Sequence, residues 1–494
     1  MIDVEICQRS VGRFGVKMFE STKTDVLIVG SGCSALYFAM RLPQDINAVL
    51  ITKSDFESSD SFLAQGGICM LNGEDDFESF FEDTLKAGHY ENDEKSVEIM
   101  IRSSLHVIEN LIEYGVDFER DEDGRLCFTR EGCHSNHRIL YHKDITGEEI
   151  TKKLLSQVKK LRNIRMYEYT ALLDIVSENN TCFGGIIKNC EGTLLSIEAK
   201  NTVLATGGIG GLYAHSTNFP HLTGDAIAIA LNHGIELRDI NYVQVHPTTF
   251  FSEKPGDRSF LISESARGEG AKLYDRDHKR FTDELLPRDL LTADIRDKMK
   301  EERSDFVWED LRRIGCNKLK RRFPNIMEYC LNRGYDPTQE CIPVVPAQHY
   351  LMGGIKTDHS GLTSMKRLYA VGETACNGVH GKNRLASNSL LEAMVFAGRA
   401  ADAVARDNAR LPHSLDLFSN IDFKMYMDYT SLTAKYAHKI QDAITCASGG
   451  SNLSGVPYKD FEKSGKSSTQ RRTIGSTPTQ GIKTGNSPVQ GRTI

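Results

Sequence analysis

A glycine-rich turn between an apolar run and an amphipathic segment constrains the fold of this chain more than any other feature. Residues 25–29 predict a buried strand and residues 36–42 a helix, and the turn between them is Gly30-Ser31-Gly32-Cys33-Ser34-Ala35. In such turns the first glycine permits a tight reversal and the second lets a pyrophosphate approach the backbone at the helix N-terminus. The small third residue, Ala35, allows the helix to pack on the strand. The pattern predicts a dinucleotide-binding βαβ unit, although a glycine-rich turn that binds nothing has the same sequence.

A second informative stretch is residues 341–391, CIPVVPAQHYLMGGIKTDHSGLTSMKRLYAVGETACNGVHGKNRLASNSLL. It combines a His beside a Gly-Gly turn, an apolar run that ends in Gly-Glu, and the run GKNRLASNS. This stretch resembles the L-aspartate oxidase branch of the succinate dehydrogenase and fumarate reductase flavoprotein family, and the resemblance covers about residues 24–410. It implies oxidation of L-aspartate to iminoaspartate, with a hydride passing from Cα to N5 of FAD. It also implies that oxygen or fumarate reoxidises the flavin and that a quinolinate synthase uses the product in NAD biosynthesis.

The resemblance extends to several segments that relatives use to hold FAD. They are a small-residue loop after the second predicted strand, a second apolar run that ends in a glycine turn, a Thr-Gly-Asp sequence, a Gly-Glu pair and the start of a helix predicted over residues 391–401. That helix N-terminus can stabilise negative charge on reduced flavin. The implied cofactor-binding residues are Gly30, Ser31, Gly32, Cys33, Ser34, Ala35, Lys53, Ser61, Ala64, Gln65, Gly66, Gly67, Thr206, Gly207, Gly208, Asp225, Glu373, Asn388, Ser389 and Leu390.

Two positions depart from the pattern at the cofactor. After the second predicted strand, residues 48–52, an acid is expected to bind ribose hydroxyls, but Lys53 stands there. In relatives that bind FAD covalently, a His stands four residues before the Ala of Ala-Gln-Gly-Gly, whereas this chain has Asp60. We therefore predict non-covalent FAD. The partner of the adenosine end is left open.

A small dianion in a partly dry pocket needs several fixed cations or strong hydrogen-bond donors. The resemblance implies that His246, His349 and Arg384 bind the substrate carboxylates and that Arg288 transfers the proton. Ser263 and Glu264 add hydroxyl and carboxylate groups to the substrate-binding set. Each residue alone could be an ordinary surface ion pair or a buried imidazole, and the prediction rests on all of them falling in matching motifs in the same order.

The segment from Thr129 to Leu140 indicates the substrate. Glu131 is the second predicted catalytic residue, because an α-ammonium group needs a nearby anion that would repel a dicarboxylate without an amine. The alternative is a solvated Glu in a charged loop. Relatives have Glu-Gly-Gly-His-Ser-His-Arg-Arg here, and this chain replaces the second Gly by Cys133, a His by Asn136 and an Arg by His137.

The predicted fold class is α/β, with a two-motif FAD-binding Rossmann-like domain interrupted by an α+β capping domain and followed by a short helical C-terminal segment. The predicted boundaries are an N-terminal extension at 1–23, flavin-domain parts at 24–239 and 351–411, a capping domain at 240–350, a truncated helical segment at 412–463, with residues 414–447 helical, and a tail at 464–494. The tail repeats a polar motif and carries five basic and no acidic residues. It cannot bury enough apolar surface to order itself, so we expect it to be disordered.

Bulk properties restrict the alternatives. The net charge of −7 argues weakly against nucleic acid, and no apolar run reaches the roughly 18 residues of a membrane span. The start of the chain lacks a signal-peptide pattern and the twelve cysteines form no Cys-x-x-Cys pair, which predicts a cytoplasmic protein with reduced thiols and no metal site. Two other functions stay open: a soluble fumarate reductase or succinate dehydrogenase-like flavoprotein, and a flavin-binding interaction protein without catalysis.

Overall fold

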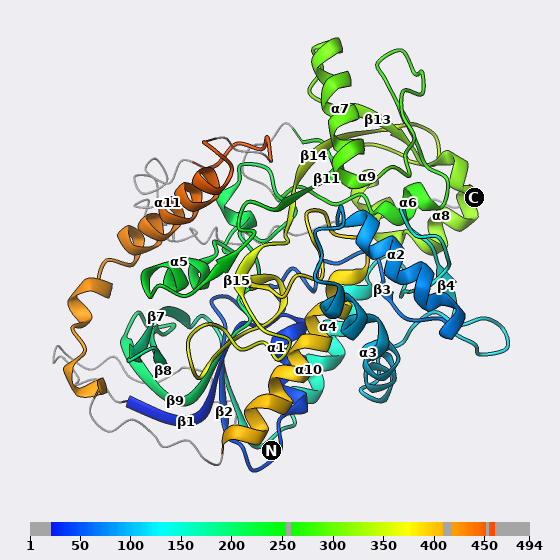
Figure 1. Ribbon diagram of the computed structural model, residues 1–494. Coiled ribbons are helices and arrows are strands. Elements are labelled where there is room, and N and C mark those ends of the chain that lie inside the picture. The colour runs from blue at the N-terminus through cyan, green and yellow to red at the C-terminus, as the bar shows by residue number, and fades with distance from the viewer. Residues whose placement is uncertain (1–20, 253–257, 409–416, 451–453, 460–494) are drawn as a thin grey trace, which may run out of the picture. The chain divides into compact units, whose positions relative to one another are not determined.

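The glycine-rich turn follows the carboxyl end of β1, an interior strand of a seven-stranded sheet whose core strands are parallel (Figure 1). The computed structural model describes residues 21–252, 258–408, 417–450 and 454–459. The strand order is β6-β2-β1-β9-β8-β7, and β16 pairs with the second half of β9. The strands are β1 (Ser21–Val29), β2 (Ala48–Ile51), β6 (Ile164–Tyr167), β7 (Ala171–Glu178), β8 (Thr181–Lys188), β9 (Leu194–Leu204) and β16 (Leu368–Ala370).

The register of this sheet brings four chain turns together. Val29 pairs with Ile51 of β2 and with Leu204 of β9, and Leu204 pairs with Ala370 of β16. The residues that follow these strands therefore leave the same edge of the sheet, where α/β proteins bind their ligands. β1 begins at Ser21, earlier than the predicted strand, because its first four residues pair with Ser196–Ala199 of β9.

Four helices pack side by side in the order α4 (Thr146–Val158), α1 (Cys33–Arg41), α10 (Asn388–Asn408) and α3 (Glu94–Glu113). Their apolar faces form the largest buried core together with β1 and β2. α10 is longer than the helix predicted from the sequence, because its buried stripe continues from Leu391 to Val404. α2 (Phe77–Ala87) packs on α3 and leads into it through residues 88–93.

Two three-stranded sheets complete this part of the chain, which we call the flavin-binding part. One contains β3 (Ile68–Cys69), β5 (Ile139–Leu140) and β4 (Phe128–Thr129), and the other β10 (Leu237–Arg238), β15 (Gly354–Lys356) and β17 (Ala375–Cys376). Helix α5 (Asp225–Asn232) packs against β7.

Residues between β10 and β15 form a separate sheet with its own core, which we call the cap. The antiparallel order is β11-β14-β13-β12, with β11 (Val243–Phe250), β14 (Ile342–Leu351), β13 (Val307–Asp310) and β12 (Lys272–Tyr274). Helices α6 (Glu264–Gly268), α7 (Arg288–Glu302), α8 (Cys316–Arg322) and α9 (Pro324–Asn332) belong to it, and Ile262, Leu291 and Phe323 lie in its apolar core. β11 and β14 carry the chain into and out of the cap. The α/β class predicted from the sequence, with an inserted α+β part, is confirmed.

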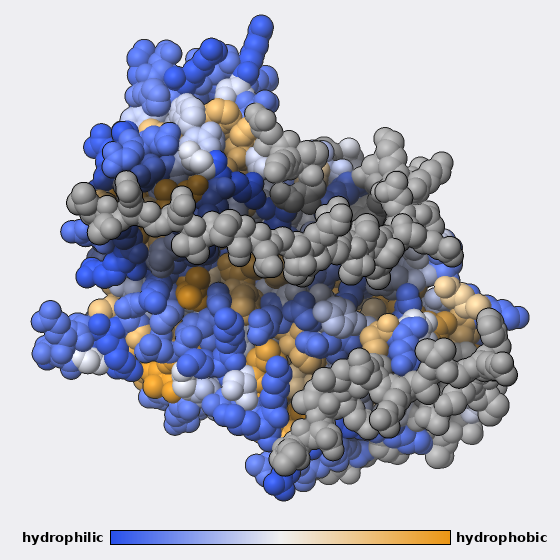
Figure 2. Space-filling view, turned by 180° about the vertical axis from the view of Figure 1, so that it is seen from behind, coloured by the Kyte–Doolittle hydropathy of each residue, from blue (hydrophilic) through white to orange (hydrophobic). Residues whose placement is uncertain are grey.

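The C-terminal segment is less helical than the sequence suggested. Two short 3-10 turns, Leu417–Asn420 and Phe423–Tyr426, precede α11 (Tyr429–Ala447). Asp428 starts α11 by accepting a hydrogen bond from the backbone N of Ser431 at 3.0 Å, so the helix begins well after residue 414. The predicted tail at 464–494 and most of the predicted N-terminal extension lie outside the described residues. Polar side chains cover most of the coloured face in Figure 2. Within the described ranges, no helix has the length and apolarity needed to cross a membrane.

Candidate active site

One cavity follows the edge of the parallel strands and continues beneath the cap, with an empty volume of about 1640 Å³ that includes its open mouth. Its wall contains both the glycine turns at the strand edge and the charged residues of the cap. The predicted residues that line it are Gly30, Ser31, Gly32, Cys33, Ser34, Lys53, Ser61, Ala64, Gln65, Gly66, Gly67, Glu131, Thr206, Gly207, Asp225, His246, Ser263, Glu264, Arg288, His349, Glu373, Arg384, Ser389 and Leu390.

Three predicted cofactor residues lie just behind the wall. Ala35 is buried where α1 packs, as its role in the turn requires. Gly208 abuts Glu373: a Cβ on Gly208 would lie 2.1 Å from Oε1 of Glu373. Asn388 is buried and donates from Nδ2 to the hydroxyl of Thr84 at 3.2 Å. These residues shape the cavity from outside it.

Backbone geometry explains the glycines at the cofactor end. Gly30 has φ = +125°, and a Cβ there would lie 2.0 Å from the carbonyl O of Ala205, the residue after β9. The two glycine turns therefore touch, and only glycine fits at position 30. Beside them, the backbone N of Cys33 at the start of α1 donates to the hydroxyl of Ser61 at 3.1 Å. This surface of small residues and backbone amides suits a pyrophosphate.

Lys53 does not leave the site without an acid. Its Nζ lies 2.7 Å from Oδ2 of Asp225 and donates to the hydroxyl of Thr223 and the carbonyl of His221, both at 3.0 Å. Asp225 is the first residue of α5, and all four residues line the cavity. The carboxylate that is missing after β2 is therefore supplied from α5, in an ion pair with the lysine that replaces it.

Two acids face the middle of the cavity without cationic hydrogen-bond partners. Oδ1 of Asp60 accepts from the backbone N of Phe219 at 3.0 Å, whereas its buried Oδ2 has no partner within the described ranges. Burial raises the pKa of Asp60 to about 7. Oε1 of Glu373 accepts from the backbone N of Leu351 at 3.0 Å, and burial, followed by the charge of Asp60, raises its pKa to about 8. Gln65 also has an unpartnered buried Oε1. A ligand rich in hydroxyl and N–H donors would satisfy these acceptors, as FAD does.

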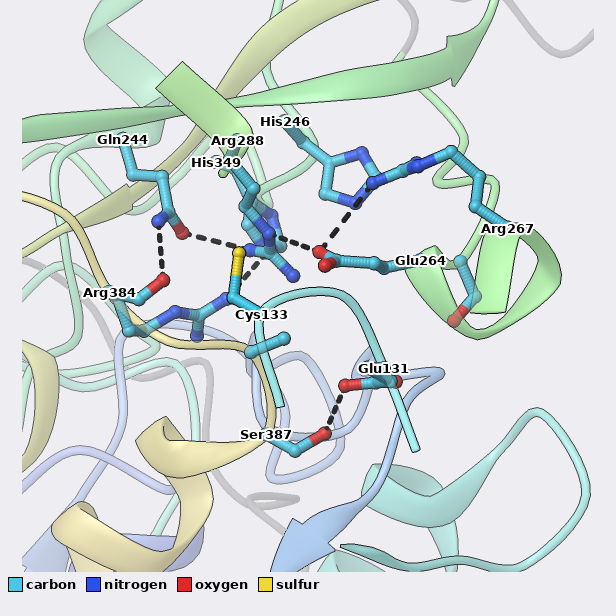
Figure 3. Close-up of polar contacts among 12 residues, drawn as sticks. Glu131, Cys133, Gln244, His246, Glu264, Arg267, Arg288, His349, Arg384 and Ser387 are labelled. Carbon is cyan, nitrogen blue, oxygen red and sulfur yellow. Dashed lines mark hydrogen bonds and ion pairs between the residues drawn. The ribbon is translucent and has the colours of Figure 1, made fainter. Parts of the chain in front are cut away.

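At the cap end, Arg288 is held in place by two other side chains (Figure 3). Its Nε donates to Oε2 of Glu264 at 2.6 Å and its Nη1 to Oε1 of Gln244 at 2.8 Å. Gln244 also donates from Nε2 to the carbonyl O of Arg384 at 2.9 Å. Gln244 thus ties together the two arginines of the predicted substrate site, a link that the sequence did not reveal.

Arg384 and His349 form a second cationic group across the cavity. Nη2 of Arg384 lies 3.1 Å from Nε2 of His349, and Nη1 donates to the hydroxyl of Ser389 at 2.5 Å. Its buried Nε has no partner among the described residues, and its guanidinium lies 4.3 Å from the centroid of the Tyr350 ring. Burial, together with the positive charge of Arg288, lowers the pKa of Arg384 to about 10.

The two predicted histidines lie edge to face, with ring centroids 5.2 Å apart. Nδ1 of His349 is 2.7 Å from the hydroxyl of Thr217, and Nδ1 of His246 is 3.0 Å from the carbonyl O of Thr248. Burial and the neighbouring arginines hold the pKa of both imidazoles well below the usual value. In the part of the chain that the structure describes, the buried Nε2 of His246 has no hydrogen-bond partner. Uncommitted nitrogens and buried cations therefore converge on one space, which suits a small dianion.

Glu264 is engaged by arginines rather than free for a ligand. Besides Arg288, its Oε2 lies 3.6 Å from Nη2 of Arg267. Burial alone would raise its pKa, but the two arginines outweigh burial and hold the pKa below the usual value. Ser263 lines the cavity and caps α6, accepting from the backbone N of Ser265 at 3.3 Å. Both residues line the cavity, and Glu264 holds Arg288.

Glu131 lies between the flavin-binding part and the cap. Its Oε1 accepts from the hydroxyl of Ser265 at 2.5 Å and its Oε2 from the hydroxyl of Ser387 at 2.6 Å. Ser387 has φ = +61°, and its hydroxyl also accepts from the backbone N of Gly67 at 3.2 Å. The strained Ser387 thus connects Glu131 to the glycine loop of the predicted cofactor site.

The loop after Glu131 explains one departure from the family pattern. Cys133, which stands where relatives have Gly, has φ = +65°, the left-handed region that favours glycine. The next residue, His134, points away from the large cavity: its Nδ1 lies 3.1 Å from Nη1 of Arg138 and its Nε2 lies 3.0 Å from the carbonyl O of Ala386.

The comparisons agree with this geometry. A family model described as an FAD binding domain matches residues 25–390, so fold and cavity define an FAD-binding flavoprotein. An L-aspartate oxidase of Clostridium perfringens is 51% identical over 76% of this chain and 85% of its own length, and one of Neisseria meningitidis is 41% identical over 78% and 79%. The chain belongs to the L-aspartate oxidase family.

The fold similarity reaches further. The FrdA chain of E. coli quinol fumarate reductase superposes with a TM-score of 0.77 at 28% identity, covering 86% of this chain and 83% of that one. A flavocytochrome c3 fumarate reductase in an open conformation superposes with a TM-score of 0.61 at 24% identity, over 78% and 79%.

Sequence reasoning missed residues that act through their neighbours. Gln244, Thr217, Tyr350 and Ser387 contact predicted residues but belong to no chemical motif of their own. Gln244 stands two positions before His246 on β11, so strand alternation is a signal that could have placed both side chains on one face.

Proposed function

We propose that this protein is an FAD-dependent L-aspartate oxidase that converts L-aspartate to iminoaspartate. The observation that carries the proposal is the joining of two sites in one cavity: a dinucleotide cradle at the strand edge and a cluster of cations and imidazoles under the cap, with Glu131 between them. The membership of the L-aspartate oxidase family supports the choice of substrate.

The residues present fit FAD. The glycine turn at Gly30 and the start of α1 would hold the pyrophosphate, Asp225 with Lys53 would hold the adenosine ribose, and Glu373 would accept from ribityl hydroxyls. The start of α10 at Asn388 would stabilise negative charge on the flavin ring. When bound, FAD supplies the two-electron acceptor that the oxidation requires, which no protein side chain provides.

The cap residues would bind and orient the amino acid. Arg384, His349 and His246 would bind the two carboxylates, and the buried, uncommitted Nε atoms make this binding favourable because the ligand ends their isolation. Glu131 would attract the α-ammonium group. Its carboxylate is held by two serine hydroxyls, so its position is fixed before substrate arrives.

Oxidation of the amine also requires that a proton leave nitrogen while a hydride leaves Cα. Arg288 is the proposed proton-transferring residue. Glu264 and Gln244 hold two of its three guanidinium nitrogens, which fixes the plane of the group at the wall of the cavity. Where the cap restricts bulk water from the cavity, the proton would pass through such a positioned group.

Further steps extend the proposal. Oxygen or fumarate would take up the electrons, and a quinolinate synthase would consume iminoaspartate on the route to NAD. The cytoplasm is the proposed compartment, because the eleven cysteines of the described residues are all free thiols.

Anaerobic reduction of bound flavin by L-aspartate, compared with reduction by succinate, tests the proposal. We expect L-aspartate to bleach the flavin absorbance and succinate to do so far more slowly. A chain that succinate reduces faster is instead a soluble fumarate reductase or succinate dehydrogenase-like flavoprotein, the candidate that the fold similarity to FrdA favours. A chain that binds FAD but is reduced by neither would be a non-catalytic flavoprotein.

Glu131→Gln separates the two enzymatic candidates further, since it keeps the shape and removes the charge. Loss of one desolvated ion pair should lower kcat/KM for L-aspartate by a factor that corresponds to about 2–4 kcal/mol of lost transition-state stabilisation. The kcat/KM for fumarate reduction should fall much less. Equal losses in both reactions would show that Glu131 does not recognise the amine. A matched control is Glu82→Gln, an exposed acid on α2 that bonds only Tyr90 among the contacts described.

A further inference from the structure

The loop between α2 and α3 contains an unusual backbone. His89 and Tyr90 both have φ = +58°, and neither is glycine. The left-handed conformation costs an L-residue roughly 1–2 kcal/mol and persists where surrounding contacts hold the backbone. We call residues 88–92 the clasp.

The clasp contacts three segments of the predicted substrate site. Nε2 of His89 lies 2.9 Å from Oδ2 of Asp289, and the carbonyl O of Gly88 accepts from the backbone N of Lys382 at 3.0 Å. The carboxylate of Glu91 accepts from the hydroxyl of Tyr242. Asp289 directly follows Arg288, Lys382 stands two residues before Arg384, and Tyr242 two residues before Gln244.

These contacts bear on Arg288 in particular. Arg288 is the first residue of α7, and within the described residues no side chain caps the N-terminus of this helix. Both partners of its guanidinium, Glu264 and Gln244, belong to the cap, and Gln244 alone continues to the flavin-binding part, where it donates to Asn383 and Arg384. The contact of His89 with Asp289 ties the first turn of α7 to the part of the chain that carries the cofactor cradle.

We propose that His89 is a positioning residue for Arg288: through Asp289 it fixes the first turn of α7, and hence the proton-transferring guanidinium, relative to the bound flavin. This inference rests on the proposed oxidation of L-aspartate. The His89 and Asp289 side chains are each 39% exposed, and a pair in contact with solvent adds little to global stability. Its effect is expected on the geometry of the reacting groups, where small displacements are costly.

The test is the rate of anaerobic flavin reduction at saturating L-aspartate in the purified, FAD-loaded chain. His89→Ala and Asp289→Ala should each slow reduction roughly tenfold, with FAD content, thermal midpoint and KM for L-aspartate close to wild type. The double variant should be no slower than either single variant, because the two residues act through one contact. His89→Gln keeps a nitrogen donor for Asp289 and should restore most of the rate.

Tyr90→Ala is the matched control. Tyr90 has the same strained backbone and 62% exposure, and its hydroxyl donates to Glu82 within the flavin-binding part. It should keep the wild-type rate. An unchanged rate in His89→Ala, additive losses in the double variant, no rescue by Gln, or an equal loss in Tyr90→Ala each overturn the proposal. A wild-type chain whose flavin is not reduced by L-aspartate would instead refute the proposed function, so the two failures are distinguishable.

Discussion

The two ends of the cavity are built from different materials. The cofactor end is built mainly from backbone turns and small side chains that follow β1, β2, β9 and β16, with the Lys53–Asp225 pair and Glu373 among its few charged groups. Each turn is contiguous in the sequence. The substrate end consists of long charged side chains from β11, α6, α7, β14 and the loop before α10, which are far apart in the chain. Backbone path decides what binds at the first end, whereas the balance of buried charges decides it at the second.

The two ends should therefore be sensitive to different kinds of substitution. Removing a charge at the substrate end leaves partners buried and unpaired, so it should alter catalysis strongly and cofactor binding little. Adding a single carbon at the cofactor end displaces a neighbour, so it should alter cofactor binding and leave the chemistry intact once FAD is bound. Four substitutions test this contrast, and they follow in order from the largest expected effect to the smallest.

Arg288→Lys should have the largest effect. A lysine cannot reproduce the paired hydrogen bonds to Glu264 and Gln244, so the proton transfer loses its positioned group. We expect kcat for L-aspartate to fall by about 10²- to 10⁴-fold with FAD content unchanged. Stopped-flow reduction and the flavin-to-protein absorbance ratio check this. Turnover near wild type would remove Arg288 from the mechanism, and loss of FAD would break the separation of the two ends.

Glu309→Gln tests a buried carboxyl group of the cap that lies outside the cavity. Glu309 is fully buried, and no described residue bonds either of its carboxylate oxygens. Burial, only partly offset by Arg267, raises its pKa to about 8. Between its unfolded pKa near 4.5 and about 8, the folded chain holds a proton that the unfolded chain releases, so stability falls as pH rises through this range.

The variant should therefore raise the free energy of unfolding by about 3 kcal/mol at pH 7 and by almost nothing at pH 4. Urea denaturation at the two pH values measures this, with kcat expected to stay at the wild-type value. A gain that does not depend on pH would show that ionisation of Glu309 is not the cause.

Gly208→Ala tests the cofactor end. Its Cβ would lie 2.1 Å from Oε1 of Glu373, which must then move from its place in the cavity wall. We expect the dissociation constant of FAD to rise about tenfold, or 1.4 kcal/mol, with kcat near wild type at saturating FAD. Fluorescence titration of the apoprotein measures the affinity. Unchanged FAD affinity together with a lower kcat would contradict the contrast between the two ends.

Cys133→Gly should have the smallest effect. Glycine removes the strain of φ = +65° but adds freedom to the unfolded chain, so the net gain in stability should be about 1 kcal/mol or less. Kinetic constants should not change, because the side chain is outside the wall of the large cavity. A fall in kcat would show that the loop of Glu131 needs the thiol itself.

The same contrast explains what could be predicted from the sequence. The turn at Gly30 was predictable because a local run of residues encodes both its strand and its sharp backbone reversal. The predictions of the α/β class and of FAD binding were confirmed for this reason. The family was also predicted correctly, from motifs such as the run that contains Arg384. The roles of single site residues remain predictions, although most of those residues line one cavity.

Side chains that act across the fold were not predictable in this way. Lys53 looked like a lost acid, because the compensating Asp225 lies 172 residues further along the chain. Gln244 and Ser387 are ordinary polar residues until the fold places them against Arg288 and Glu131. The predicted start of the C-terminal helix was wrong, because a single capping aspartate, not apolar periodicity, decides where α11 begins.

The buried cations of the proposed substrate end would also affect the lifetime of the protein. Arg384 lies buried near Arg288, so a dicarboxylate bound there would stabilise the folded chain by relieving repulsion as well as by mass action. At a ligand concentration one hundred times Kd, the gain is about 2.7 kcal/mol. Proteases that cleave the transiently opened chain would then find it open about a hundredfold less often. On the proposed function, the supply of substrate would set how long each molecule survives as well as how fast it works.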